Sequence, residues 1–203
     1  MNQKRDFYDD LAFGQKGEVL MTNFFIIKLN EKTQTHKWSI IETGTGKSWD
    51  VKAQAYKKIE DKVSIFPDTS IQPIHIEIKT DVYHTRTGNM FIELKSRGKK
   101  SGLDATKSDY FVYFFMRTDL YPQDNVWMIS TKLLKQLSHK WRNDPRYERR
   151  GGDNNSSEAL VIPLEELKQY FKVLTYTDYE MVYSQQLGVE TKIVTKKKIG
   201  FEF

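Results

Sequence analysis

Two copies of the pattern Glu-x-Lys lie in the stretch from Ile74 to Lys95, and either could serve metal-assisted chemistry on a phosphate. The first copy is Glu77-Ile-Lys79 and the second is Glu93-Leu-Lys95. Residues two apart in a strand face the same side, so each glutamate would share a face with its lysine. A carboxylate oxygen is a ligand that Mg²⁺ prefers, and a nearby ammonium can neutralise charge that develops on a phosphate.

Asp50 could supply a second carboxylate to such a centre. It stands between Trp49 and Val51, so strand alternation would place the acid opposite these two apolar side chains. Two carboxylates on one face can hold a Mg²⁺ ion that polarises a phosphate and lowers the pKa of a bound water. We therefore expect Asp50 and Glu77 as metal ligands and Lys79 beside the attacking water. A solvated sheet face with alternating charges is the alternative.

These residues are predicted to lie on a β-hairpin. Ile74–Asp81 alternates apolar and charged residues, Arg86–Asn89 has the composition of a turn, and Met90–Lys95 resumes the alternation. Antiparallel pairing would then place Glu93 opposite Asp81 and Lys95 opposite Lys79. Asp81 with Glu93 and Lys95 thus remains a second possible catalytic set.

The flanking elements are predicted from periodicity and turn residues. A helix is expected from Asp6 to Phe24, with Glu18 at the edge of its apolar stripe, and Lys52–Ser64 reads as a charged surface segment with a short helix. The apolar run Tyr110–Phe115 predicts a strand buried on both faces, parallel to the second hairpin strand across the Ser96–Asp109 connection. Further strands are expected at Phe25–Leu29, Trp38–Glu42, Asn125–Ser130 and Ala159–Ile162.

The C-terminal third is predicted to add helices and a basic loop. A helix over Thr131–Trp141 would be capped by a hydroxyl side chain and turn Leu133, Leu134 and Leu137 inward. Arg142–Ser157 reads as a mobile basic loop. A second helix would begin at Pro163, with inward side chains at Leu164, Leu167, Tyr170 and Phe171.

Composition narrows the classes of protein. The 203 residues contain no cysteine, which excludes disulfides, cysteine nucleophiles and thiolate zinc sites. The polar start and the lack of a long apolar run predict a cytoplasmic protein without a membrane span. The formal net charge of +5 is compatible with a polyanionic partner.

The order of these features resembles the PD-(D/E)XK phosphodiesterase superfamily, whose members have the restriction-endonuclease-like fold. The resemblance rests on Asp50, on Glu77-Ile-Lys79, and on the later strings Thr87-Gly-Asn89, Gly98-Lys-Lys-Ser-Gly102 and Thr106-Lys-Ser-Asp109, which are similar to strings in small phage and bacterial members. It covers about residues 8 to 116. It implies an α/β (α+β) fold with a mixed β-sheet flanked by helices in the order αβββαβ, in one nuclease domain over residues 1–203, with a core of about 8–130 and a C-terminal elaboration of about 131–203.

The resemblance also implies roles for individual residues. Asp50, Glu77 and Lys79 would be catalytic, and Glu18 would orient a metal-bound water. Asp81 and Glu93 would be further metal ligands or support the first ones. The predicted DNA contacts are Arg97, Lys99, Lys100, Ser101, Thr106 and Lys107, although helix capping and a crossover turn would equally account for Ser101 and Thr106.

The function expected from the sequence is that of a Mg²⁺-dependent DNA endonuclease, with Mn²⁺ able to substitute, of phage or bacterial type and acting in DNA repair or recombination. No helix-turn-helix or zinc module is present, which favours structure-directed or nonspecific cutting. Cutting two strands at once would call for a homodimer with two sites. The alternative is a catalytically inactive DNA-binding relative that retains the fold.

Overall fold

The fold is described from a computed structural model of the chain. It describes residues 7–44, 48–60, 62–82, 84–116, 125–142, 144–151, 155–174 and 176, with the backbone alone at 7–10, 84 and 85. The predicted C-terminal tail from Thr175 therefore lies almost wholly outside the described residues.

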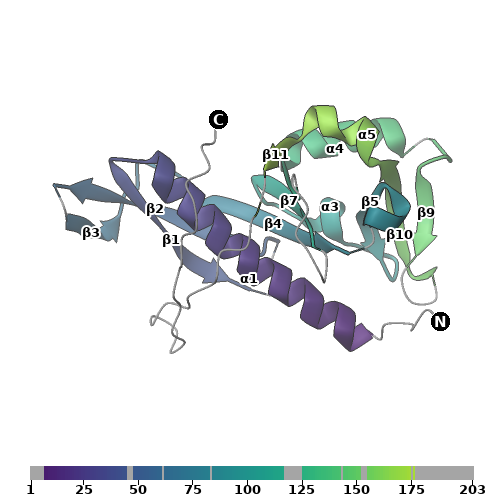
Figure 1. Ribbon diagram of the computed structural model, residues 1–203, viewed down its shortest axis with the longest axis horizontal. Coiled ribbons are helices and arrows are strands. Elements are labelled where there is room, and N and C mark those ends of the chain that lie inside the picture. Colours follow the sequence, from purple (N-terminus) through teal and green to yellow (C-terminus); the bar gives the residue numbers. More distant parts are fainter. Residues whose placement is uncertain are drawn as a thin grey trace.

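The protein has an α+β fold in which a mixed β-sheet is flanked by helices (Figure 1). The larger sheet has seven strands in the order β1-β2-β4-β7-β8-β11, and β3 pairs with β2 beside this path. A smaller sheet has four strands in the order β6-β5-β10-β9. The strands of the larger sheet are β1 (His36–Thr43), β2 (Val51–Ile59), β3 (Lys62–Pro67), β4 (Ile74–Asp81), β7 (Tyr110–Phe115), β8 (Val126–Ser130) and β11 (Lys172–Leu174). The remaining elements are β5 (Asn89–Ser96), β6 (Lys99–Lys100), β9 (Glu148–Gly151), β10 (Ser157–Pro163), α1 (Phe7–Lys32), α2 (His84–Thr87), α3 (Gly102–Ala105), α4 (Thr131–Trp141), α5 (Leu164–Leu167) and the 3₁₀ helix η2 (Lys168–Tyr170).

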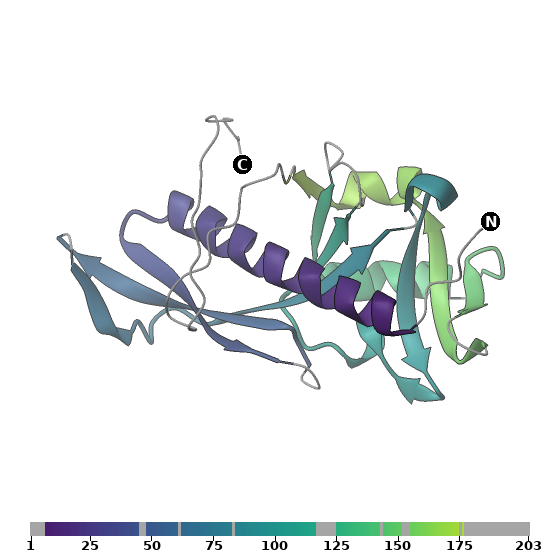
Figure 2. The same ribbon diagram turned by 60° about the horizontal axis from the view of Figure 1, so that its bottom comes forward.

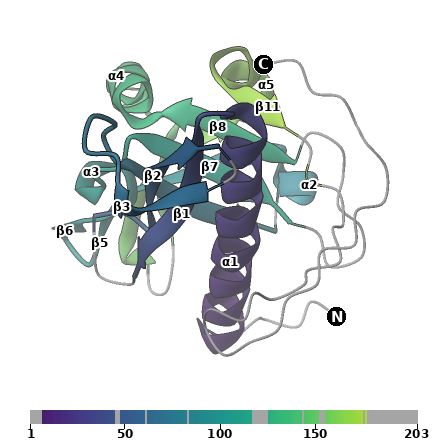
Figure 3. The ribbon, with the colours of Figure 1, turned by 90° about the vertical axis from the view of Figure 1, so that its left-hand side faces the viewer.

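Helix α1 covers one face of the larger sheet, and α3, α4 and the smaller sheet lie on the other face (Figure 3). It is longer than predicted and includes Phe25–Leu29, so the strand expected there is wrong. The buried residues keep helical spacing through Phe24, Phe25 and Lys28. From Phe24 to the end of the helix there is no glycine or proline to interrupt it. Tertiary burial of this face thus outweighed the local β-propensity of the aromatic and isoleucine residues.

The predicted hairpin is also wrong, because its two strands belong to different sheets. Strand β4 pairs with β2 on one side and with β7 on the other, whereas β5 pairs with β10 and β6. Glu93 therefore lies opposite Ala159 and not opposite Asp81. The partner that β5 takes is more than sixty positions away in the chain, and local alternation carries no signal for such a distant pairing.

Strand β7 confirms the expected strand buried on both faces. Phe111 and Tyr113 point into the core between the two sheets, while Val112 and Phe114 point toward α1. Its parallel partner is β4 and not β5, so the crossover connects β4 to β7 and includes the β5–β6 excursion. This arrangement fixes Glu77 and Lys79 beside Phe111 and Tyr113 in register.

Four further expectations need correction. The described residues of Lys52–Ser64 belong to β2 and β3 and include no helix, and Arg142–Ser157 contains the strand β9. Ser130 caps α4, because its hydroxyl accepts a 3.2 Å hydrogen bond from the Leu133 backbone N–H. Leu134 and Leu137 are buried in this helix as expected, but Leu133 is 38% exposed. Tyr170 is likewise exposed, since it lies in η2 and not in a continued helix.

Candidate active site

Asp50 lies beside the edge of β4, at the point where β2 stops pairing with β4. The last ladder pair is Val51 with Ile76. The Asp50 backbone N–H donates to the Ile76 carbonyl at 3.0 Å, and its Oδ2 accepts a 2.6 Å hydrogen bond from the Ile78 N–H. The carboxylate thus replaces the next backbone acceptor of the ladder, which fixes its position beside β4.

Glu77 and Lys79 lie next to this carboxylate on the same strand. Strand alternation turns both side chains away from the α1 core, and Lys79 Nζ lies 2.6 Å from Glu77 Oε1. The Glu77 side chain is 9% exposed and that of Lys79 is 37% exposed. The pair is therefore anchored in the protein at the glutamate and open to solvent at the lysine.

Glu18 reaches the same group from α1, as its position beside the apolar stripe suggested. Its carboxylate interacts electrostatically with Lys79 and Glu77. The preceding residue, Gly17, packs against Thr80 so closely that a Cβ there would overlap the threonine hydroxyl. A glycine at this point lets the helix approach β4 and brings Glu18 over the edge of the strand.

Electrostatic interactions show that the four side chains form one group. The pKa of Asp50 is raised to about 6, chiefly by burial; Lys79 and the Ile78 hydrogen bond oppose this rise, and Glu77 and Glu18 add to it. Burial also raises the pKa of Glu18. Burial alone would lower the pKa of Lys79, but Glu77 and Asp50 raise it more, so the ammonium stays protonated at neutral pH.

The chemistry of this donor set fits a divalent cation. With all groups ionised, the three carboxylates Glu18, Asp50 and Glu77 and the one ammonium of Lys79 leave two negative charges in excess. Carboxylate oxygens in such excess suit Mg²⁺ or Mn²⁺. Among the described residues, no three acidic or histidine side chains already form a close ligand cluster, and Glu77 is turned toward Lys79. A cation would therefore compete with the ammonium for Glu77.

Asp81 and Glu93 line a cleft together with Lys79, but neither is among the main influences on the pKa of Glu18, Asp50 or Lys79. Both interact electrostatically with the hydroxyl of Tyr113, whose pKa is raised by burial and then by these two acids. Ser101 donates a 2.6 Å hydrogen bond to one oxygen of Glu93, and Ser157 donates a 2.8 Å bond to the other. Lys95, the lysine of the second Glu-x-Lys, pairs at 2.7 Å with Glu158. The second copy of the pattern is thus tied into the smaller sheet.

The residues predicted to bind DNA divide into two groups. Arg97, Lys99, Lys100 and Lys107 are exposed. Thr106 is only 2% exposed, and its hydroxyl donates to the Ser48 carbonyl at 2.8 Å and accepts a hydrogen bond from the Ser108 N–H. Thr106 thus joins the start of β7 to the Asp50 segment. Ser101 occupies the N-cap position of α3, but its hydroxyl bonds to Glu93 and not to the helix.

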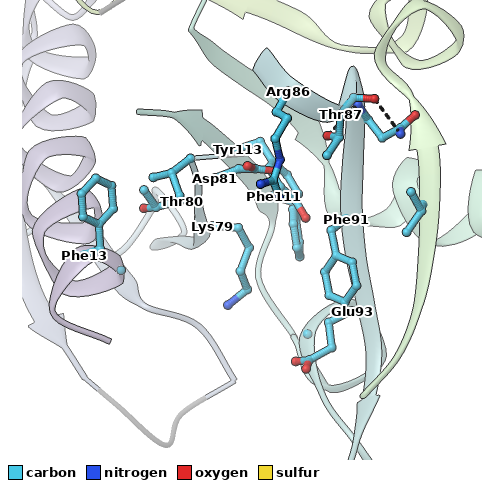
Figure 4. Close-up of a pocket in the computed structure, with 15 residues that line it drawn as sticks. Phe13, Lys79, Thr80, Asp81, Arg86, Thr87, Phe91, Glu93, Phe111 and Tyr113 are labelled. Carbon is cyan, nitrogen blue, oxygen red and sulfur yellow. Dashed lines mark hydrogen bonds between the residues drawn. The ribbon is translucent and has the colours of Figure 1, made fainter. Parts of the chain in front are cut away.

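Sequence reasoning missed a cleft that adjoins the site. Its volume is about 670 Å³, and it lies between α1 and β5, with β4 and β7 behind it (Figure 4). Phe13, Phe91 and Tyr113 line it together with Lys79. The sequence signal was an aromatic residue, Phe91, on the strand face that otherwise carries Glu93 and Lys95, and it could not reveal what lies opposite.

Comparison of the chain with known protein families, curated proteins and solved structures gave no match. Among the residues that the structure describes, no helix is both long and apolar enough to cross a membrane.

Proposed function

We propose that this protein is a metal-dependent DNA endonuclease that hydrolyses phosphodiester bonds. The observation that carries the proposal is the convergence of Glu18, Asp50, Glu77 and Lys79, which come from a helix, a loop and a strand, into one electrostatically interacting group. The order α1, β1, β2, β4, α3 and β7, with β2 and β4 antiparallel and β4 and β7 parallel, further supports the restriction-endonuclease-like core that the resemblance implies.

The geometry supports a division of roles among these residues. Asp50 and Glu77 would hold the cation, which when bound supplies Lewis-acid polarisation of the phosphate. Lys79 carries a stable positive charge at the solvent side and would stabilise the negative charge that builds up on the phosphate oxygens. Glu18 would position water over the edge of β4. DNA phosphates would be contacted by the exposed cations Arg97, Lys99, Lys100 and Lys107. A structural role is enough to explain the buried hydroxyl of Thr106.

The decisive experiment compares Lys79→Ala with Lys95→Ala, since each removes the lysine of one Glu-x-Lys. Supercoiled plasmid and circular single-stranded DNA are incubated with Mg²⁺ or Mn²⁺. We expect the wild-type protein and Lys95→Ala to nick or linearise the DNA, and Lys79→Ala to be at least about 100-fold slower. Melting midpoints of both variants check that each is folded.

The alternative function, that of an inactive DNA-binding relative, predicts a different outcome. DNA would be bound by the wild-type protein, but none of the substrates would be cut with either metal. Absence of both cleavage and binding would contradict both functions.

A further inference from the structure

The cleft beside Lys79 has two walls that face each other across its opening. Phe13 projects from α1 on one side and Phe91 from β5 on the other, and Phe111 and Tyr113 form the back (Figure 4). The back is closed, since Phe111 and Tyr113 are at most 3% exposed. A ligand in the cleft would therefore lie between Phe13 and Phe91, where Lys79 also lines the cleft.

Phe91 is an unusual residue for the surface of a well-packed sheet. It is 37% exposed, whereas Met90 and Ile92 on either side are completely buried. One edge of its ring lies close to Gly151 in β9. A Cβ added to Gly151 would be 3.4 Å from that ring edge. Phe91 also lines the cleft, so its exposed part offers an aromatic surface there on which a flat ring can stack.

Polar groups at the rim add hydrogen-bonding capacity. Arg86, Asp81 and Asn89 line the cleft, and the Asn89 side chain is held in place by a 2.8 Å hydrogen bond from its Nδ2 to the Thr87 carbonyl. Because burial raises the pKa of Tyr113, its hydroxyl remains a hydrogen-bond donor. A site with aromatic walls and fixed donors and acceptors suits a ligand that is flat, aromatic and polar at its edges, as a nucleobase is.

Size and position favour a nucleotide over an unrelated small molecule. A cleft of about 670 Å³ is ample for one nucleotide. Lys79 belongs both to the cleft and to the proposed catalytic group, so a base in the cleft and a phosphate at Lys79 would belong to the same strand. A base stacked and paired within a duplex cannot enter such a cleft, because it must first leave its helix.

We propose that this cleft receives the base of an unpaired nucleotide next to the scissile phosphate, so that the enzyme prefers DNA with single-stranded, bulged or flapped nucleotides. The inference deepens the proposed nuclease function and rests on it. It assigns Phe91 to substrate selection and separates that role from the chemistry of Asp50, Glu77 and Lys79.

The test uses three labelled duplexes of one sequence: fully paired, with one bulged adenine, and with the bulged adenine replaced by an abasic nucleotide. A fourth carries 2-aminopurine at the bulge. Affinity is measured in Ca²⁺ and cleavage in Mg²⁺ or Mn²⁺. We expect the wild-type protein to bind the bulged DNA about tenfold or more tightly than the other two, and to quench the 2-aminopurine by stacking.

Variants identify the cleft as the source of this preference. Phe91→Ala should abolish the preference and the quenching, whereas Phe91→Trp should keep both. Tyr170→Ala is the matched control, because Tyr170 is 36% exposed and lies on η2, away from the cleft. Phe13→Ala removes the opposite wall and should have the same effect as Phe91→Ala. Melting midpoints exclude unfolding.

Equal affinity for the three duplexes would overturn the inference, as would an unchanged preference in both Phe91→Ala and Phe13→Ala. Lys79-dependent cleavage would then still support the proposed function. If none of the DNAs is bound or cut, the proposed function fails and the inference fails with it.

Discussion

The Asp50 carboxylate accepts a 2.6 Å hydrogen bond from the backbone N–H of Ile78, one residue from each member of the Glu77–Lys79 pair. This bond places an acid from the end of one strand against the edge of the next, although the two residues are far apart in sequence. Burial of the carboxylate, together with Glu77 and Glu18, opposes its ionisation there, whereas Lys79 and the Ile78 hydrogen bond favour it. A bound cation would favour the ionised form further.

Asn at position 50 should stabilise the metal-free protein at high pH. The pKa of Asp50 in the folded protein is about 6, against an ordinary value of 3.8 that applies in the unfolded chain, so the folded state loses stability as pH rises between these values. Above about pH 7 the loss is complete and amounts to roughly 2–3 kcal/mol. Asp50→Asn keeps an acceptor for the Ile78 N–H without the charge. Its melting midpoint in EDTA should exceed that of the wild type at pH 8 and match it near pH 4.

Addition of Mg²⁺ or Mn²⁺ provides the control for this prediction. Binding to the folded state should raise the wild-type midpoint at pH 8 and leave Asp50→Asn nearly unchanged. A variant that is less stable than the wild type at both pH values would contradict the electrostatic origin.

Glu77 and Glu93 should differ in what their replacement removes. Glu77→Gln weakens the proposed metal site, so cleavage should fall at least about 100-fold with a small change in stability. Glu93→Gln loses two charge-assisted hydrogen bonds from Ser101 and Ser157, and should lower the free energy of unfolding by about 1–3 kcal/mol while the folded fraction still cuts DNA. Denaturant titration and plasmid cleavage measure the two effects. The opposite pattern would move the catalytic role to the second Glu-x-Lys.

Gly17 and Gly14 offer a matched pair on α1. Alanine favours a helix over glycine by about 1 kcal/mol, and a Cβ at Gly14 meets nothing within 4 Å, so Gly14→Ala should be neutral or stabilising. A Cβ at Gly17 overlaps Thr80, and displacing the helix should cost about 1–3 kcal/mol. Gly17→Ala should therefore lower the melting midpoint, and should slow cleavage further because Glu18 moves with the helix. Equal midpoints for the two variants would show that the close contact is unimportant.

The exposed lysines of β6 should contribute to DNA affinity through counterion release. If Lys99 and Lys100 each contact a phosphate, the double alanine variant should reduce the slope of log affinity against log salt by about 1.8. The control is the double variant Lys57→Ala with Lys58→Ala. These two lysines are exposed and lie on β2. The end of the molecule formed by β2 and β3 is far from β6 (Figure 2). Fluorescence anisotropy across a salt series measures the slope. An equal loss in both double variants would indicate a nonspecific effect of charge.

The sequence alone determined the local features of this protein. Alternation predicted β4, an unbroken apolar run predicted the doubly buried β7, and helical spacing placed Glu18 at the edge of a stripe. The residue types Asp50, Glu77 and Lys79 indicated a set of charges suited to a divalent cation. Each of these features depends on neighbours within a few positions, where side-chain periodicity is strong.

Only the tertiary structure decided which strands are partners. The alternation of β5 is compatible with pairing to β4 or to β10, so it could not exclude the hairpin. In the structure β5 pairs with β10, and its apolar face packs in the core with residues of α3 and α4. The same packing extended α1 through Phe25–Leu29 and set Phe13 opposite Phe91 across the cleft. Contacts between residues so distant in sequence arise from the sum of burial over the whole chain, which no local pattern records.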